Sequence, residues 1–210
     1  NWYWASAGKT LTAFLVGIAK DKGILSLENR SSIFLGNGWT SLEESQESLI
    51  KIKHHLTMTT GLDYLVDNLN CTDPNCLTYK NTPGTNWFYH NATYSLLKDV
   101  IENTTQTSYN EFTNQKLKIK IGMGGSWIQL NNSDTYYSTA RDMARFGLLI
   151  LNEGVWDEDV ILNDTNYFSN MVNTSQEINK SYGYLWWLSG AECLIRPGMT
   201  IPIEASVASN

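Results

Sequence analysis

No apolar run in this 210-residue sequence approaches the roughly 18 residues that a membrane-spanning helix needs. The sequence also lacks any segment rich in lysine and arginine, and its formal net charge is −6. These absences argue against a transmembrane segment, and against nucleic acid or an anionic membrane surface as a partner. With 42% hydrophobic residues, the chain is still long enough for one large core or two small lobes.

Several motifs of other hydrolases and of metal sites are missing as well. No G-x-S-x-G occurs, which argues against the nucleophile elbow of α/β-hydrolases. No H-E-x-x-H occurs, and adjacent helical residues such as His54 and His55 point about 100° apart. We interpret these two histidines as a cap and a surface residue. The glycines of Gly122-x-Gly124-Gly125 lack the Lys-Ser/Thr of a phosphate loop and indicate a turn. We therefore expect no metal and no cofactor.

Cysteines are few, and only two of the three form an informative pair. Cys71 and Cys76 bracket Thr-Asp-Pro-Asn, a turn-forming sequence that can bring two thiols together. We favour a local disulfide in an exported, periplasmic or extracellular protein. The alternatives are two unpaired thiols in a cytosolic loop or, less favoured, a zinc knuckle, which lacks a second ligand pair. Cys193 is left over and is expected to be free. The chain shows no signal peptide and no initiator Met, so an export signal could have been removed.

Hydrophobic periodicity predicts a helix-rich unit without internal repeats. The helix that starts at Ser6 continues until Gly23 stops it. A later helix begins at the capping pair Thr139 and Asp142 and runs to Gly154; because it is apolar nearly all round, we expect it to be buried. Further helices are expected over 47–58, 92–102 and 108–118, a loop over 63–86 and a short strand over 182–188.

The helix starting at Ser6 carries an S-x-x-K motif, Ser6-Ala-Gly-Lys9. This spacing puts the serine hydroxyl and the lysine amine on one helix face, one turn apart. There the amine can take the serine proton and create an acylating nucleophile. The pattern alone is weak evidence, since a helix-start serine with a solvated lysine is its commonest explanation. Two further copies occur in this chain, Ser48/Lys51 and Ser95/Lys98.

Five segments, taken together and in order, resemble the serine β-lactamase and penicillin-binding protein superfamily, closest to its class C-like branch. That branch contains β-lactamases, esterases, peptidases and amide hydrolases. The order also selects among the serines, because only Ser6 precedes both the second segment and the tyrosine-containing third one. Ser48 stands where the family has a surface helix, and Ser95 follows the tyrosine within a packing helix. The segments are Ser6–Thr12, Leu56–Leu62, Trp87–Asn91, Ser138–Gly147 and Gly183–Leu188.

The resemblance implies an α+β, β-lactamase/transpeptidase-like fold, here mostly the helical lobe with a partial sheet. It implies that Ser6 forms an acyl-enzyme with a small-molecule amide or ester and that Lys9 accepts or relays its proton. Tyr89 would be the general base or the proton donor to the leaving group; the alternative for this residue is a core aromatic that packs with Trp87 and Phe88. Asn91 would orient Lys9 and bind the substrate. The Ser6 backbone N–H would form half of the oxyanion hole.

One family motif has no counterpart at its expected place. The third box, Lys/His-x-Gly, should lie near the C-terminus, but Lys120-Ile-Gly122 comes too early and no lysine or histidine follows Gly190. Only five residues precede Ser6. The resemblance thus implies one domain over 1–210, incomplete at both ends and nearly inactive by itself. The alternative is a non-catalytic sensor domain that captures peptidoglycan-like ligands in a groove of its eight Trp and eleven Tyr. The oligomeric state is not indicated.

Overall fold

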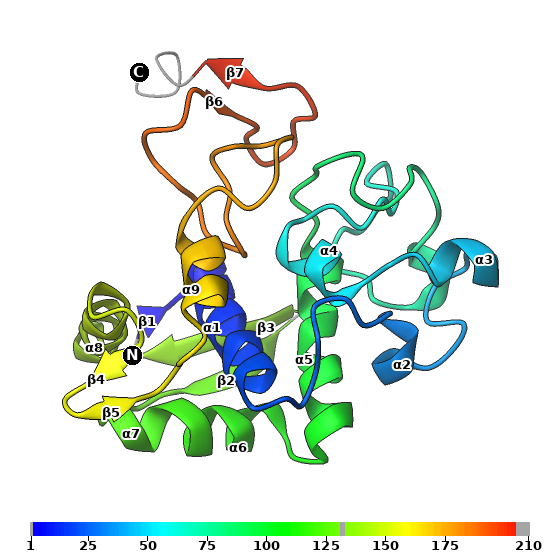
Figure 1. Cartoon of the computed structure of the whole chain (residues 1–210). Helices are drawn as coiled ribbons and strands as arrows, with labels where there is room; N and C mark the ends of the chain where they lie inside the picture. Colours follow the sequence, from blue (N-terminus) through cyan, green and yellow to red (C-terminus); the bar gives the residue numbers. More distant parts are fainter. Residues whose placement is uncertain (1, 131–132, 205–210) are drawn as a thin grey trace.

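The computed structural model describes residues 2–130 and 133–204 and has one helix at its centre (Figure 1). This helix, α1 (Gly8–Asp21), continues from a 3₁₀ turn, η1 (Ala5–Ala7). Every residue from Leu11 to Ala19 is buried, as the apolar spacing predicts. The helix ends where Gly23 adopts a φ of +69°, so the predicted helix between Ser6 and Gly23 is confirmed.

A three-stranded antiparallel sheet in the order β1-β3-β2 packs against the start of α1. Its strands are β1 (Trp2–Tyr3), β2 (Ser126–Leu130) and β3 (Ser133–Ser138). Trp127 of β2 lies opposite Tyr136 of β3, and both are buried. A Cβ on Gly8 would come within 3.4 Å of Trp127, so α1 and the sheet are closely packed. The β2–β3 hairpin was not predicted from the sequence.

Helix α5 (Asn91–Thr105) packs beside α1 and also contacts α2 (Ser32–Leu35) and α4 (Ile52–Leu56). Its apolar face is fully buried at Leu97, Val100 and Ile101. The prediction of a helix over 92–102 is confirmed, and the observed helix extends slightly beyond it at both ends.

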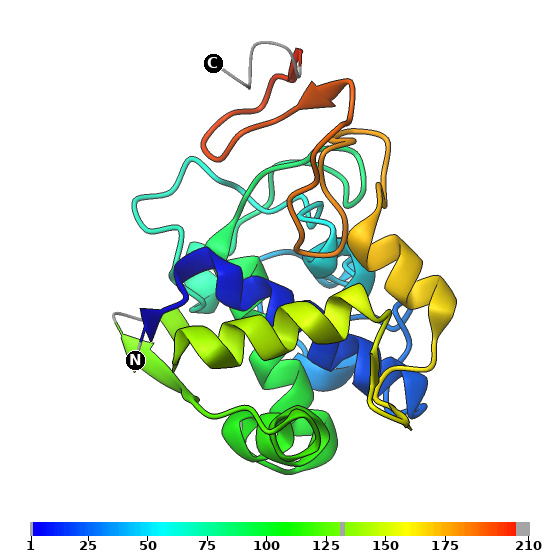
Figure 2. The same ribbon diagram turned by 90° about the vertical axis from the view of Figure 1, so that its left-hand side faces the viewer.

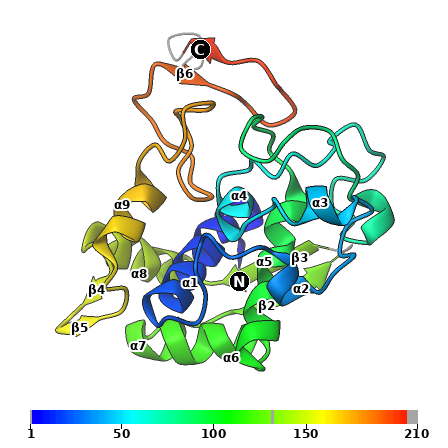
Figure 3. The same cartoon turned by 45° about the vertical axis from the view of Figure 1, so that its right-hand side comes forward.

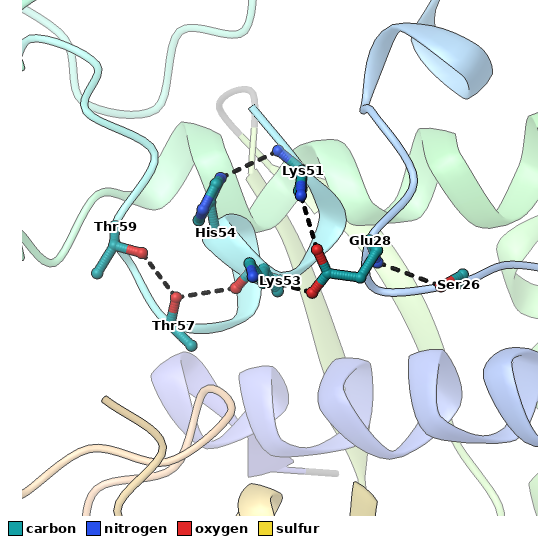
Figure 4. A network of polar contacts seen from close by, with 7 residues as sticks. All are labelled: Ser26, Glu28, Lys51, Lys53, His54, Thr57 and Thr59. Atoms are coloured by element: carbon teal, nitrogen blue, oxygen red, sulfur yellow. Dashed lines mark hydrogen bonds and ion pairs between the residues drawn. The ribbon is translucent and has the colours of Figure 1, made fainter. Parts of the chain in front are cut away.

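The single helix predicted over 47–58 is wrong, because α3 (Glu44–Glu47) and α4 are separate. Lys51 between them adopts an extended conformation, and its N–H donates to His54 Nδ1 to cap α4. Figure 4 shows how the segment before α2 holds this junction: Glu28 accepts from Lys51 Nζ (2.7 Å) and Lys53 Nζ (2.9 Å). The two lysines hold the pKa of the Glu28 carboxyl at about 2.

His54 is the cap that the sequence predicted, but the prediction of a surface position for His55 is wrong. His55 is fully buried. Its Nδ1 lies 2.7 Å from the Thr93 carbonyl oxygen and its Nε2 lies 2.8 Å from Ser31 Oγ. The neutral imidazole with Nδ1 protonated satisfies both contacts, donating to the carbonyl and accepting from the hydroxyl. His55 therefore joins α4 to α5 and to the start of α2.

The helical segment predicted over 108–118 is confirmed and runs further, as α6 (Tyr109–Thr113), a π turn (Asn114–Lys118) and α7 (Ile119–Ile121). Gly122 ends it with a φ of +64°, which agrees with the predicted turn.

Helix α8 (Ala140–Leu151) has the predicted Thr139–Asp142 capping box but is not buried all round. Figure 2 shows it crossing α1, and Phe146 packs edge-on against Phe14 at 5.8 Å. Leu148 and Leu151 are exposed, because only one face of α8 meets the core. The prediction of a fully buried helix is therefore wrong.

The part of the chain after α8 is made of short elements. A hairpin of β4 (Val155–Trp156) and β5 (Asp159–Val160) leads to α9 (Thr165–Val172). The pair β6 (Cys193–Leu194) and β7 (Ile203–Glu204) lies apart from the three-stranded sheet, as Figures 1 and 3 show.

The strand predicted over 182–188 is wrong, because this segment folds into a tight turn. Tyr182 bridges to Trp187, and Leu185 between them has a φ of +59°. The Leu185 N–H donates to the Leu56 carbonyl at 2.9 Å, which fixes the turn on the end of α4.

The 63–86 segment is loop-like, as predicted, apart from a 3₁₀ turn, η2 (Pro74–Cys76). Cys71 and Cys76 form the predicted disulfide, with Cα atoms 5.9 Å apart, and Cys193 is free. Within the described ranges, no helix is long and apolar enough to cross a membrane.

Gly17 lets α1 pack tightly against α9. A Cβ at Gly17 would lie 2.4 Å from Tyr167, whose hydroxyl donates to the Ala13 carbonyl at 2.6 Å. We expect Gly17→Ala to lower the free energy of unfolding by about 2 kcal/mol, because overpacking outweighs the helix propensity of alanine. Gly147→Ala is the control: its Cβ meets nothing within 4 Å, so a gain of about 0.5 kcal/mol is expected. Urea unfolding checks both, and equal changes would contradict the packing argument.

Candidate active site

A cleft of about 520 Å³ opens at the N-terminal end of α1. Three of the four residues proposed from the sequence line it: Ser6, Lys9 and Asn91. The fourth, Tyr89, lies beside Lys9, with the lysine Nζ 4.9 Å from its ring centroid. The structure thus brings all four residues together, although they come from segments some eighty residues apart.

Ser6 is exposed at the N-terminal end of α1. It lies in the 3₁₀ turn that precedes the helix, where the first N–H groups lack intrahelical acceptors. Ala5 before it has a φ of +48°, in the left-handed region that non-glycine residues seldom adopt. This conformation turns the chain from β1 into the helix and presents the Ser6 hydroxyl to the cleft.

Lys9 is 4% exposed, one turn into the helix from Ser6. Burial lowers the pKa of its amine from 10.5 to about 8. Within the described ranges no carboxylate forms an ion pair with it, and its Nζ lies instead over the rings of Tyr89 and Tyr94. A lysine with such a pKa exists partly as the free amine near neutral pH, so it can accept a proton.

Tyr89 is half-buried between Ser6 and the turn that contains Trp187. Burial raises the pKa of its phenol, and hydrogen bonds donated by the Ser6 hydroxyl and the Trp187 indole partly offset that rise. The Tyr89 position is set by the preceding residue, because Phe88 N–H donates to the Met58 carbonyl at 3.1 Å. The raised pKa keeps the Tyr89 phenol neutral beside the Ser6 side chain.

Asn91 is the first residue of α5. Its Oδ1 is buried and has no hydrogen-bond partner among the described residues. A buried amide oxygen without a partner is unfavourable unless a ligand or a neighbouring donor completes it. This oxygen is thus available to a substrate N–H or to the amine of Lys9.

A family model for beta-lactamases matches residues 2–199. The chain belongs to the beta-lactamase family. The resemblance inferred from the five sequence segments is therefore confirmed, as is the α+β, β-lactamase/transpeptidase-like fold.

Solved structures with the same fold superpose on most of the chain. A putative beta-lactamase from Bacteroides dorei is 18% identical, with a TM-score of 0.73, over 96% of this chain and 73% of its own. A putative 6-aminohexanoate-dimer hydrolase from Bacillus anthracis is 19% identical, with a TM-score of 0.69, over 95% and 63%. A D-stereospecific amidohydrolase from Streptomyces is 14% identical, with a TM-score of 0.65, over 88% and 69%. No curated protein sequence matches the chain.

The other two S-x-x-K copies of this beta-lactamase-family chain do not form comparable sites. Ser95 is buried and donates to the Asn91 carbonyl at 3.1 Å. Lys98 pairs with Asp134 at 3.1 Å. Lys51 pairs with Glu28, and neither residue lines the cleft. Only the first copy combines an exposed serine with a buried, unpaired lysine.

The cleft also contains residues that sequence reasoning did not single out. Along β3, Thr135 and Tyr137 line the cleft while Tyr136 between them is buried in the core. Asn70 reaches the cleft from the loop beside the disulfide. Tyr94 lies one helical turn after Asn91, a spacing that could have suggested a shared face. No local signal marks the others.

Lys120, the one match to the family's third box, is exposed at the end of α7 and does not line the cleft. Across residues 2–130 and 133–204 there is no group of three or more His, Cys, Asp or Glu side chains that could hold a metal ion.

Proposed function

We propose that the chain is a serine hydrolase domain that acts on a small amide or ester through an acyl-enzyme on Ser6. The observation that carries this proposal is the buried, unpaired Lys9 one turn from the exposed Ser6, with Tyr89 against both. The names of two structural neighbours, an aminohexanoate-dimer hydrolase and an amidohydrolase, favour an amide substrate. The Cys71–Cys76 disulfide favours an exported protein.

In the proposed reaction, Ser6 Oγ attacks the carbonyl carbon while its proton passes to a neighbouring base. The lowered pKa of Lys9 and the raised pKa of Tyr89 favour Lys9 as that base. Tyr89, still protonated, then donates a proton to the leaving amine or alcohol and recovers one by way of Lys9. Water attacks the acyl-enzyme in the second half, releasing the acid and restoring the Ser6 hydroxyl.

The roles of the remaining groups follow from their positions. We propose that the Asn91 amide binds the substrate or steadies Lys9, and that the Ser6 backbone N–H stabilises the oxyanion. The family's third box is not recognisable after Gly190 in the sequence. We therefore propose that residues 1–210 form one domain without this box, in which acylation and turnover are both slow.

The test is acylation of Ser6 in the 210-residue chain. We expect a fluorophosphonate probe and p-nitrophenyl acetate each to add one adduct by intact mass, and Ser6→Ala to add none. Ser48→Ala, which alters a partly exposed serine outside the cleft, is the matched control and should label as the parent does. Equal labelling of the parent and Ser6→Ala would reject the proposed nucleophile. Binding of a peptidoglycan fragment that survives in Ser6→Ala, without any adduct in the parent, would instead favour the non-catalytic sensor.

A further inference from the structure

Lys9 has a second aromatic neighbour that the proposed mechanism does not use. Its Nζ lies 4.1 Å from the centroid of the Tyr94 ring, closer than the 4.9 Å to Tyr89. Tyr94 comes from α5, one turn beyond Asn91, and is 5% exposed. A cation at this distance from a buried ring face interacts favourably with the ring quadrupole.

The Tyr94 ring is held in this orientation from its far end. Its hydroxyl donates to the Asp134 backbone carbonyl at 2.9 Å, on strand β3. The carboxylate of Asp134 is itself occupied by Lys98 Nζ at 3.1 Å. The ring is thus fixed between the sheet and α1, with its face toward Lys9.

Few other groups can balance the charge of Lys9. From the 3₁₀ turn before its helix the polar neighbour is Ser6, from the loop before α5 it is Tyr89, and from α5 it is Asn91. The sheet contributes Asp134, already paired, and the cleft lining adds the phenols of Tyr3 and Tyr137. None of these is a carboxylate in an ion pair with Lys9, so the aromatic faces are its main source of negative potential.

We propose that Tyr94 is a positioning residue: its ring face holds the ammonium group of Lys9 and sets the pH at which Lys9 becomes a base. The effect of Tyr94 on catalysis rests on the proposed function. Its effect on the protonation of Lys9 rests only on the contact between the Lys9 Nζ and the Tyr94 ring. Burial favours the neutral amine, whereas the ring favours the cation. Removing the ring while keeping the site dry therefore lowers the pKa of Lys9 further, and a weaker base results.

The test is a direct titration of Lys9. Protein labelled with [ε-¹³C]lysine is titrated by NMR, and the Lys9 signal is assigned by its loss in Lys9→Met. We expect Tyr94→Leu to lower the midpoint by about one pH unit. Tyr94→Phe, which keeps the ring and loses only the hydrogen bond to Asp134, should leave the midpoint nearly unchanged. The acid limb of the pH profile for Ser6 acylation should move with the midpoint.

A series of variants that keeps the ring shape tests the same inference even where Tyr94→Leu fails to fold. Phenylalanine with one, two or three ring fluorines at position 94 weakens the quadrupole stepwise without changing the packing. The midpoint should fall progressively along the series. An unchanged or rising midpoint overturns the inference, whether or not Ser6 reacts. A falling midpoint in a chain whose Ser6 is never acylated supports the inference and rejects the proposed function.

Discussion

Replacing Lys9 with methionine is expected to slow Ser6 acylation by about 10³-fold and, at pH 7, to raise the free energy of unfolding by up to about 3 kcal/mol. The loss follows because the proposed base is gone. The gain follows because the folded chain lowers the pKa of Lys9 from 10.5 to about 8, so the buried charge costs stability wherever the lysine is protonated in both states. Methionine fills a similar volume without that cost.

The stability gained in Lys9→Met should depend on pH, because the parent and the variant respond differently to it. Between pH 8 and 10.5 the unfolded chain holds a proton on Lys9 that the folded chain has lost, so the parent becomes relatively more stable as the pH rises. The advantage of Lys9→Met should therefore be largest below pH 8 and vanish near pH 10.5. Urea unfolding at several pH values, together with the rate of probe labelling, measures both effects.

Lys120→Met is the matched control for Lys9→Met. Lys120 is exposed and lies outside the cleft, so neither the rate nor the stability should change appreciably. A large loss of labelling in Lys120→Met would instead assign it the family's third-box role. A Lys9→Met protein that is less stable than the parent at pH 7 would contradict the argument from the buried charge.

Acidification from pH 7 to pH 4 is expected to cost about 3 kcal/mol of stability for each of His54 and His55. Burial lowers the pKa of both imidazoles from 6.5 to about 4. In the unfolded chain these imidazoles therefore bind protons near pH 6.5, whereas in the folded chain they bind them only near pH 4. The free energy of unfolding falls as the pH falls through that window. Burial also lowers the pKa of His90, which acts in the same direction.

The slope of the unfolding free energy between pH 6.5 and 4.5 reports mainly on the histidines, because carboxyls with lowered pKa contribute mainly below that range and Asp99, whose pKa burial raises, acts with the opposite sign. His54→Asn keeps an acceptor near the Lys51 N–H and should reduce the slope markedly. His55→Asn loses the contact to Ser31 and should have lower stability but also a smaller slope. Parent and variants with the same slope would show that these imidazoles titrate normally in the folded chain.

The parts of the fold that could be predicted from the sequence are those determined by the spacing of residues close together in the chain. The apolar period of α1, the Thr139–Asp142 capping box and the short Cys71–Cys76 loop each depend on residues that are near one another in the chain. The candidate catalytic residues were proposed from motif order, which the family's topology constrains. Local information was sufficient for these features.

The wrong predictions concern residues whose surroundings are assembled from distant segments. His55 is buried because α2 and α5 cover a helix of only five residues, which no periodicity of α4 could reveal. The segment around Leu185 has strand-like composition, yet the bond to Leu56 and the positive φ make it a turn. Tyr94 contacts Lys9 only because α1 and α5 pack together. Such contacts follow from tertiary structure alone.

The alternation of side chains along β3 has a consequence for how relatives of this protein can diverge. Tyr136 belongs to the buried core under α1, whereas Thr135 and Tyr137 belong to the wall of the cleft. Successive strand residues point to opposite faces, so a mutation at the partly exposed Tyr137 changes the cleft wall without altering the packing of Tyr136, whereas Thr135 is itself buried. The cleft wall at Tyr137 can therefore change among relatives while Tyr136 maintains the core packing.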